Sequence, residues 1–261
     1  MEKERVIYYQ DELNDDFAGN DIKRKPTKNS FKYVHRSWVY RANSFMVKFF
    51  IAIPILWIMN TFIFRPKVEN KKVLKYFKKK GYYLYSNHVL PFDPVVLPIK
   101  THASKNTVIV AGQELFSISG FVTGFVRHMG AIPIPNHDMG MMENFVDCLS
   151  YNIKKGNRVL IFPEAHIWPY YNDIRHFKSV SFKYPVDDNV PIFIATTTFK
   201  KRKGKRKPKP IIYIDGPFFP DETLSYRERV TDLAERAYEA MCYRAHNENN
   251  YAYIKYVKKS D

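Results

Sequence analysis

The sequence has little cysteine. Only two residues of this type, Cys148 and Cys242, occur among the 261 of the chain. Two cysteines cannot form a multi-disulfide framework, and neither stands at a spacing typical of metal ligands. We therefore expect the chain to fold in a reducing compartment without a bound metal, and we interpret both cysteines as structural. The sequence also has no internal repeat.

Acidic residues are outnumbered by basic ones. The chain has 26 Asp and Glu against 42 Lys and Arg, which gives a formal net charge of +16. Such an excess predicts an anionic partner: lipid head groups, nucleic acid, or an acidic substrate such as a phosphorylated cofactor. Because no motif of a nucleic-acid-binding module accompanies the charge, we expect an anionic membrane surface and no nucleic acid.

A cleavable signal peptide is not expected at the start of the chain. Residues 1–30 are polar and charged, unlike the apolar core of a signal peptide. We expect them to be poorly ordered or peripheral, and we assign residues 1–37 to a polar N-terminal extension. The length of the chain suits one large α/β domain, or one domain with a membrane-facing appendage.

One apolar run stands apart. Phe49 to Phe64 reads FFIAIPILWIMNTFIF, 16 residues without a charge, whereas a helix needs about 20 apolar residues to span a bilayer. Basic residues and aromatic residues typical of a membrane interface surround the run. They are Arg41, Lys48, Arg65 and Lys67, and Trp38, Tyr40 and Trp57.

The apolar run permits three interpretations. Its length alone allows a buried core helix. A full span is also open, with Lys48 reaching back to the head groups. We favour a helix or helical hairpin lodged in one leaflet, kinked by Pro54. We therefore assign residues 38–68 to a membrane-associating helical segment, and we expect the protein at the cytoplasmic face of a membrane.

The rest of the chain alternates short apolar strands with helical stretches. We expect strands over Tyr82–Ser86, Thr107–Ala111, Ala131–Ile134, Arg158–Phe162, Val190–Thr197 and Pro210–Asp215. We expect helices over Lys71–Lys80 and Ser117–His128, from the N-cap Asp138 to Lys155, and from the capping box at Ser225 to about His246. This alternation predicts an α/β fold with a largely parallel mixed sheet flanked by helices. We place this domain at residues 69–247, followed by a tail at 248–261.

A basic run, residues 200–209, lies between the last two predicted strands. It could be a solvated hairpin loop. It could also contact anionic lipid, where each basic residue near the surface contributes about 1 kcal/mol, or nucleic acid. Of the functional interpretations we favour lipid.

A histidine and an aspartate with four residues between them are the most informative feature. Asn87-His88-Val89-Leu90-Pro91-Phe92-Asp93 follows the predicted strand Tyr82–Ser86 directly. Histidine is well suited to take a proton at neutral pH, and a nearby carboxylate can orient it and stabilise its charged form. Taken alone, the pair could also be ordinary loop or core residues. Glu164 likewise follows a predicted strand, and sites in such sheets usually lie at the carboxyl ends of strands.

Three further motifs follow in order: Gly130-Ala131-Ile132-Pro133-Ile134-Pro135-Asn136, Phe162-Pro163-Glu164-Ala165 and Val190-Pro191-Ile192. Together with the His-x4-Asp element and the pair Phe177-Lys178, they resemble the glycerolipid acyltransferase family, whose members include the 1-acylglycerol-3-phosphate acyltransferases. The resemblance covers roughly Val73 to Gly216 and the apolar segment before it.

The resemblance implies transfer of a fatty acyl group from a thioester of coenzyme A or acyl carrier protein to a hydroxyl of a membrane lipid acceptor. His88 would be the general base and Asp93 would orient it and stabilise its charge. Pro163 and Glu164 would help to bind the acceptor. No cofactor other than the acyl-CoA or acyl-ACP co-substrate and no covalent acyl-enzyme are implied.

Four more residues complete the substrate-binding candidates: Asn87, Gly130, Asn136 and Lys178. Structural roles also stay open at this stage. Asn87 could stabilise its loop, and Asp93 could be a helix N-cap before a proline at the first helical position. Glu164 could accept hydrogen bonds from acceptor hydroxyls or from a neighbouring loop.

Two positions depart from the family pattern. Members with phosphorylated acceptors usually carry an arginine where this chain has Asn136, and another soon after the Pro-Glu motif, where it reads Ala165-His166-Ile167-Trp168. Asparagine cannot replace the charged, forked contact that arginine makes with phosphate. The basic residues that could substitute are Arg127, His128, His137, Arg175 and, as first choice, Lys178.

The departures leave alternatives to a phosphorylated acceptor. One is a related acyltransferase with a non-phosphate or amine acceptor, and another is an inactive lipid-binding homologue. The segment after Glu164 is rich in aromatic residues, with Trp168, Tyr170 and Tyr171 close together. It suits a pocket for an apolar or sugar-like group, or simple packing.

Overall fold

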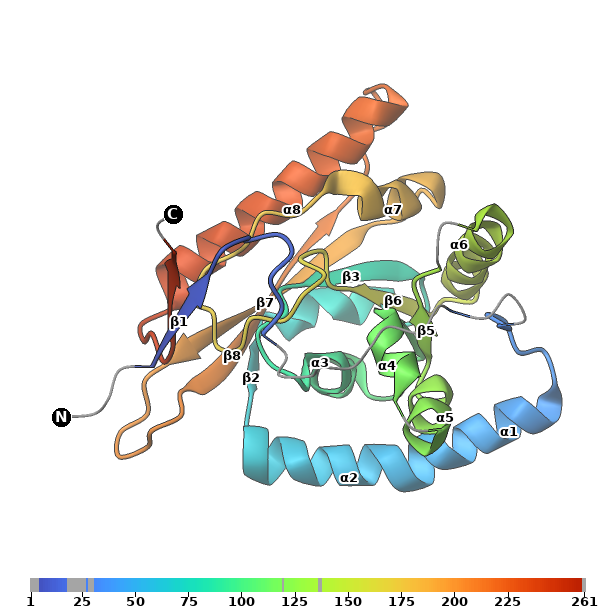
Figure 1. The fold of residues 1–261 in the computed structure, drawn as a ribbon. Helices are drawn as coiled ribbons and strands as arrows, with labels where there is room; N and C mark the ends of the chain where they lie inside the picture. The colour runs from blue at the N-terminus through green and yellow to red at the C-terminus, as the bar shows by residue number, and fades with distance from the viewer. Residues whose placement is uncertain (1–4, 18–26, 28–30, 119, 136–137, 260–261) are drawn as a thin grey trace.

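A seven-stranded mixed sheet forms the centre of the computed structural model, which describes residues 5–17, 27, 31–118, 120–135 and 138–259. Its strand order is β2-β8-β7-β3-β6-β4-β5, and every neighbouring pair is parallel except β7 and β8 (Figure 1). The strands are β2 (Lys67–Glu69), β3 (Tyr82–Ser86), β4 (Thr107–Ala111), β5 (Ala131–Pro133), β6 (Arg158–Ile161), β7 (Ile192–Lys200) and β8 (Lys209–Phe218). The predicted α/β fold with a largely parallel mixed sheet is confirmed.

Helices cover both faces of the sheet (Figure 1). The α-helices of the domain are α3 (Asp93–His102), α4 (Gln113–Ser117), α5 (Gly120–His128), α6 (Met139–Lys154), α7 (Lys183–Asp187) and α8 (Tyr226–Glu248). Two 3-10 helices, η3 (Lys71–Phe77) and η4 (Ser179–Phe182), complete this set.

The central strand β3 shows how the two cores form. Its side chains alternate between the faces of the sheet. Tyr83 and Tyr85 join a core with residues of α6, α7 and α8, whereas Tyr82 and Leu84 join a core with residues of α3 and η3. All five residues of β3 are buried, as expected of a strand covered on both faces.

Most predicted elements occur with small shifts. The strands Tyr82–Ser86 and Thr107–Ala111 have the predicted bounds. The helix expected over Ser117–His128 corresponds to α5, which begins at Gly120, and the short helix α4 before it was not predicted. The helix expected over Lys71–Lys80 is the 3-10 helix η3.

The predicted caps of the two long helices are present. The side chain of Asp138 accepts a hydrogen bond from the backbone N–H of Met141 at the start of α6. Ser225 and Glu228 form the capping box of α8, in which the backbone N–H of Ser225 donates to Glu228 Oε2 at 3.0 Å.

The apolar segment is one continuous helical rod. It runs through α1 (Trp38–Met46), the π-helical turns η1 (Val47–Ala52), α2 (Ile53–Ile58) and the π-helical turns η2 (Met59–Phe64). Pro54 lies in the first turn of α2, directly after η1, so the hydrogen-bond register changes there and the chain does not turn back. The alternative of a helical hairpin is therefore wrong.

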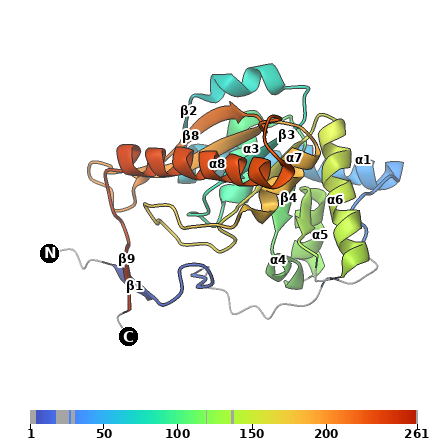
Figure 2. The same ribbon diagram turned by 90° about the horizontal axis from the view of Figure 1, so that it is seen from above.

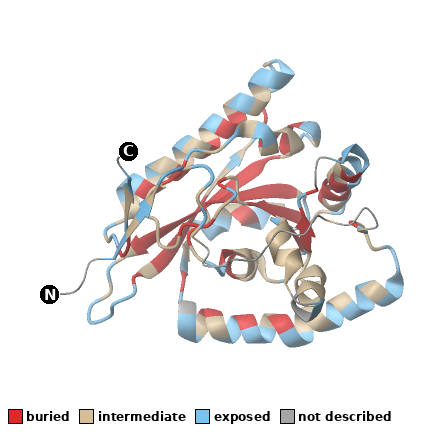
Figure 3. Ribbon diagram, viewed as in Figure 1, coloured by how far each residue is buried: buried red, intermediate tan, exposed pale blue. Residues whose placement is uncertain are grey.

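Only a narrow stripe of side chains on the rod is buried against the domain. Ala52, Leu56 and Asn60, spaced by four residues, are buried, whereas most of the other side chains are exposed or half-buried (Figure 3). Trp38–Ile63 forms a single helix that, by its length and composition, could cross a membrane. The helix is longer than the uncharged run because it also includes residues 38–48.

The chain termini are better organised than predicted. β1 (Val6–Tyr9) pairs in parallel with β9 (Lys255–Lys258), and this two-stranded sheet lies beside the main domain (Figure 2). Within the described residues, the N-terminal extension is thus held by the C-terminal tail and is not merely peripheral. This pairing could not be predicted from the sequence, because almost the whole chain separates the two strands.

Candidate active site

The register of two neighbouring strands brings His88 and Glu164 together. β3 and β6 are parallel neighbours in which Tyr85 lies opposite Ile161. His88 and Glu164 each lie three residues beyond that pair, at the carboxyl ends of their strands. The backbone N–H of His88 donates to Glu164 Oε2 at 3.1 Å.

The imidazole of His88 is held between an aromatic ring and a carboxylate. It stacks on Phe162, with 4.4 Å between ring centroids, and its Nδ1 lies 3.6 Å from Asp93 Oδ2. This separation is an ion-pair contact and too long for a hydrogen bond. The His88 side chain is 17% exposed and the Asp93 side chain 1%, so the histidine, but not its partner, reaches solvent.

Asp93 secures the loop that carries His88. Its Oδ2 accepts hydrogen bonds from the backbone N–H groups of Val89 at 3.0 Å and Leu90 at 2.8 Å. Asp93 is the first residue of α3, and the N-cap is Phe92, so the N-cap interpretation of Asp93 is wrong. The carboxylate caps the preceding loop, and its buried Oδ1 accepts no hydrogen bond from a described residue.

Glu164 is paired within the protein. Its Oε1 accepts the backbone N–H of Arg175 at 3.0 Å, and its Oε2 lies 3.5 Å from Arg175 Nη2. Burial raises the pKa of Glu164, against the opposing charge of Arg175. Because both oxygens hold the backbone of neighbouring loops, the geometry favours the loop-stabilising interpretation of this residue. Sequence reasoning missed the Glu164–Arg175 pair, which no local motif indicates.

Arg175 is enclosed and does not face an acceptor. Its side chain is 1% exposed, donates to the carbonyl oxygens of Glu12 and His166, and lies over the ring of Trp168 at 5.0 Å. In this structure Arg175 is therefore not accessible as a substitute ligand for an acceptor phosphate.

The aromatic segment after Glu164 is a packing element. Trp168 is fully buried and contacts Tyr9, Phe17 and Tyr256 from the two ends of the chain. Its Nε1 donates to the carbonyl oxygen of Asp15 at 2.8 Å. Of the two interpretations of this segment, packing is the one that the structure supports for Trp168.

This segment also holds the His88 loop from the other side. The backbone N–H of Trp168 donates to the carbonyl oxygen of His88 at 3.2 Å, and that of Tyr170 donates to Val89 at 2.8 Å. The His88 loop is thus fixed by Glu164, by Asp93 and by the aromatic segment.

Asn87 links two strands. Its Nδ2 donates to the carbonyl oxygen of Thr197 at 3.0 Å, and its Oδ1 accepts the Thr197 backbone N–H at 2.8 Å. The amide continues the pairing of β3 with β7 beyond the last residue of β3. With its side chain used in this way, Asn87 has the loop-stabilising geometry.

Gly130 is required by the backbone. Its φ is +95°, and a Cβ at this position would lie 2.2 Å from the carbonyl oxygen of Thr107. Its own carbonyl oxygen accepts the backbone N–H of Ile109 at 2.9 Å. The geometry shows a structural reason for glycine at this position.

The remaining candidates are less closely tied to His88. Pro163 is half-buried between Phe162 and Glu164. Lys178 is exposed and precedes η4. Asn136 and His137 lie outside the described residues.

Two of the proposed substitutes for arginine contact the segment around the apolar rod. Arg127 Nη2 lies 3.3 Å from His35 Nε2, and His128 Nδ1 lies 2.8 Å from Ser44 Oγ. Among the described residues, no group of three His, Cys, Asp or Glu could hold a metal ion.

The geometry places a partly exposed histidine, His88, beside the buried carboxylate of Asp93. Among protein-family models, the one described as Acyltransferase matches residues 65–195. No curated protein matches the chain.

A search of solved structures supports the same fold. The chain is similar to the crystal structure of the 1-acyl-sn-glycerophosphate (LPA) acyltransferase PlsC from Thermotoga maritima, with a TM-score of 0.55 and 16% identity. The match covers 84% of this chain and 87% of that one. With the family match spanning half of the sequence, the chain belongs to the acyltransferase family.

Proposed function

We propose that this protein is a membrane-associated O-acyltransferase that moves a fatty acyl group from acyl-CoA or acyl-ACP to the hydroxyl of a glycerolipid-type acceptor. The observation that carries the proposal is the pairing of His88 with Asp93 at 3.6 Å, on a loop held from three sides. A general base of this kind contributes about 10²–10⁴-fold to the rate.

The chemistry needs only a base and a positioned thioester. Because Nδ1 of His88 faces Asp93, Nε2 is the nitrogen that takes the hydroxyl proton. The hydroxyl oxygen then forms the ester bond to the carbonyl carbon, and the C–S bond breaks. The proton passes from His88 to the departing sulfur, while Asp93 stabilises the transient imidazolium.

The exposed face of the apolar rod supports membrane association. Large apolar side chains line this face, among them Trp38, Phe50, Trp57, Phe62 and Ile63, which are 57–78% exposed. Contiguous exposed apolar surface of this kind marks an interaction site. Because the opposite stripe packs on the domain, the rod is best suited to lie in one leaflet at the cytoplasmic face.

We propose two classes of acceptor, one phosphorylated and one without a phosphate. A phosphorylated glycerolipid would have Lys178 as its first candidate ligand. An acceptor with a non-phosphate or amine group is favoured by the enclosure of Arg175. An inactive lipid-binding homologue is the third candidate, and the paired His88 and Asp93 count against it.

The test is lipid-product analysis by mass spectrometry with the full-length protein, both donors, and a panel of phosphorylated and neutral acceptors. We expect His88→Ala to abolish transfer and to retain the fold, and we expect His246→Ala, a change to an exposed histidine, to keep activity. Wild-type turnover by His88→Ala would rule out the proposed base. If the wild type releases no thiol with any combination of donor and acceptor, the inactive homologue is favoured.

A further inference from the structure

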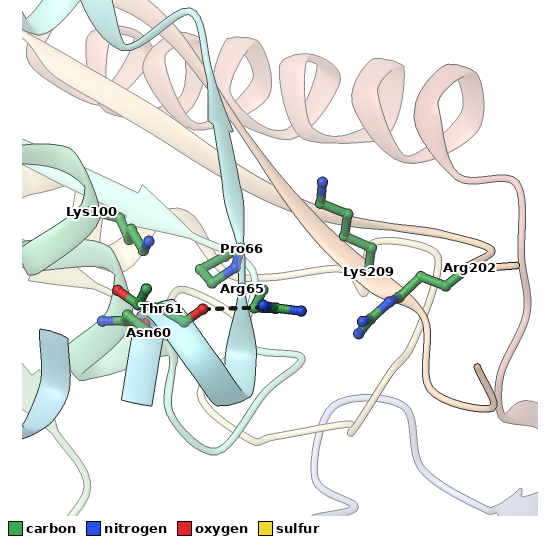
Figure 4. A pocket seen from close by; sticks show the side chains of 7 residues that line it. All are labelled: Asn60, Thr61, Arg65, Pro66, Lys100, Arg202 and Lys209. Carbon is green, nitrogen blue, oxygen red and sulfur yellow. Dashed lines mark hydrogen bonds between the residues drawn. The ribbon is translucent and has the colours of Figure 1, made fainter. Parts of the chain in front are cut away.

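An open pocket lies at the C-terminal end of the apolar rod. Its volume is about 450 Å³, and it is bounded by the rod, by α3 and by the hairpin between β7 and β8 (Figure 4). The pocket is separate from the His88 loop and includes none of the residues discussed above as catalytic.

Four cationic side chains line this pocket. They are Arg65, Lys100, Arg202 and Lys209, and they come from three parts of the chain, because Arg202 and Lys209 belong to the same β7–β8 hairpin. Figure 4 shows Arg65 and Arg202 extending toward one another. No lining residue is a carboxylate, and among the described residues none of the four forms an ion pair.

Such a concentration of like charge is unfavourable without an anion. An anion bound among the four cations would relieve this repulsion.

Asn60 provides an independent indication of a ligand. It lines the pocket and is 1% exposed. Neither its Nδ2 nor its Oδ1 has a hydrogen-bond partner among the described residues. Buried amides are normally satisfied, because an unpaired one loses its hydrogen bonds to water without replacement. A bound group with oxygen acceptors would take a hydrogen bond from Nδ2.

We propose that this pocket binds a phosphate group. Two planar guanidinium groups, two ammonium groups and one amide N–H match the charge and the multiple oxygens of a phosphate. The pocket also adjoins the exposed apolar face formed by residues such as Phe62 and Ile63. A phosphate held there would belong to a membrane-lipid head group or to coenzyme A.

The position of Lys100 relates the pocket to the active site. Lys100 and Asp93 belong to the same helix, α3, and are seven residues apart. At 1.5 Å per residue, about 10 Å of helix separates them. The pocket therefore lies one short helix away from the catalytic loop, and binding can be measured without reference to catalysis.

The first test compares two double variants of equal charge. Lys100→Gln with Arg202→Gln removes two pocket cations, whereas Lys203→Gln with Lys205→Gln removes two exposed cations from the same hairpin that do not line the pocket. The probes are phosphatidylcholine vesicles with and without phosphatidic acid, and soluble coenzyme A. We expect binding of a phosphate probe to weaken about tenfold or more in the pocket variant, and far less in the control.

The two phosphate sources give different outcomes that both support the pocket. A selective loss of vesicle binding alone identifies a lipid head group, and a selective loss of coenzyme A binding identifies the acyl carrier. Equal weakening in the two double variants, or no weakening in either, would overturn the proposal, because it would show that only diffuse charge acts.

A single variant tests the buried amide. Asn60→Leu keeps a similar volume and removes the unpaired polar atoms. We expect a higher melting temperature in the absence of ligand and weaker binding of the phosphate probe. Unchanged affinity in Asn60→Leu would contradict a role of this amide in the site, and the melting temperature shows that the variant is folded.

Discussion

Glu164 holds the backbone of His88: its Oε2 accepts the His88 N–H at 3.1 Å, and the same carboxylate is paired with the buried guanidinium of Arg175. The base proposed for catalysis is therefore positioned by a carboxylate from the turn that follows the neighbouring strand β6. This arrangement connects the second half of the domain to the His-x4-Asp motif and suggests how activity and stability are coupled.

Removing one partner of the buried pair should cost stability. In Glu164→Gln, Arg175 stays buried without a counter-charge, and we expect a loss of about 3–5 kcal/mol in the free energy of unfolding. Arg175→Met should cost a similar amount. Because neither charge remains in the double variant, its loss should be smaller than the sum of the two. Denaturant unfolding measures these values, with the exposed Glu235→Gln as control. Additive losses would show that the two side chains do not act as a pair.

Two substitutions of Asp93 should distinguish its structural role from its electrostatic role. In Asp93→Asn one amide oxygen can still accept hydrogen bonds from the backbone of Val89 and Leu90, but the negative charge beside His88 is lost. We expect kcat to fall roughly 100- to 10,000-fold with a melting temperature near that of the wild type. Asp93→Ala should lose both activity and stability. Wild-type kcat in Asp93→Asn would assign the carboxylate a purely structural role.

The contact between the termini and the aromatic segment should affect activity at a distance. Tyr256 stacks on Trp168, with 4.9 Å between the ring centroids and 17° between the planes, and its hydroxyl donates to the carbonyl oxygen of Pro169. Tyr256→Ala should loosen this segment and, through it, the His88 loop. Since a misplacement of about 1 Å can cost 100-fold in rate, we expect at least a tenfold loss of kcat.

Hydrogen exchange provides the readout that links this loss to the loop. Faster exchange at residues 166–171 should accompany the lower kcat of Tyr256→Ala. Tyr251→Ala, in the same tail, is the control and should change neither quantity. Unchanged exchange at residues 166–171 in Tyr256→Ala would show that the terminal sheet does not hold the segment.

Two glycines should respond in opposite ways. Gly130→Ala places a Cβ 2.2 Å from a carbonyl oxygen at a φ of +95°, so we expect a destabilisation of more than about 2 kcal/mol. Gly124→Ala, within α5 and with no atom within 4 Å of the new Cβ, should stabilise the protein by up to about 1 kcal/mol. Thermal unfolding of both variants checks this. A tolerated Gly130→Ala would contradict the steric requirement.

Local sequence signals were sufficient where an element depends on its own residues. The strand Tyr82–Ser86 is an apolar run that ends at a polar loop, and its bounds were predictable. The caps at Asp138 and Ser225 were predictable for the same reason, since each cap acts over three residues.

Long-range pairing could not be predicted in the same way. Arg175 was one of several possible phosphate ligands in the sequence, and only the fold makes it the partner of Glu164. From the sequence, Trp168 could have lined a pocket or packed in a core. In the fold, residues from both ends of the chain cover it. The sequence of the apolar run does not indicate that the Asn60 amide is buried, or that it has no hydrogen-bond partner in the part of the chain that the structure describes.

The sequence by itself determined the α/β class, the order of the motifs and the choice of His88 and Asp93 as the candidate base and its carboxylate, because strand periodicity and short motifs are properties of neighbouring residues. Only the tertiary structure decided what surrounds them. The parallel register of β3 and β6 sets Glu164 against the His88 backbone, and the packing of the apolar rod brings Asn60 and four cations from distant segments into one pocket. Such contacts depend on how elements pack in space, and no local pattern records them.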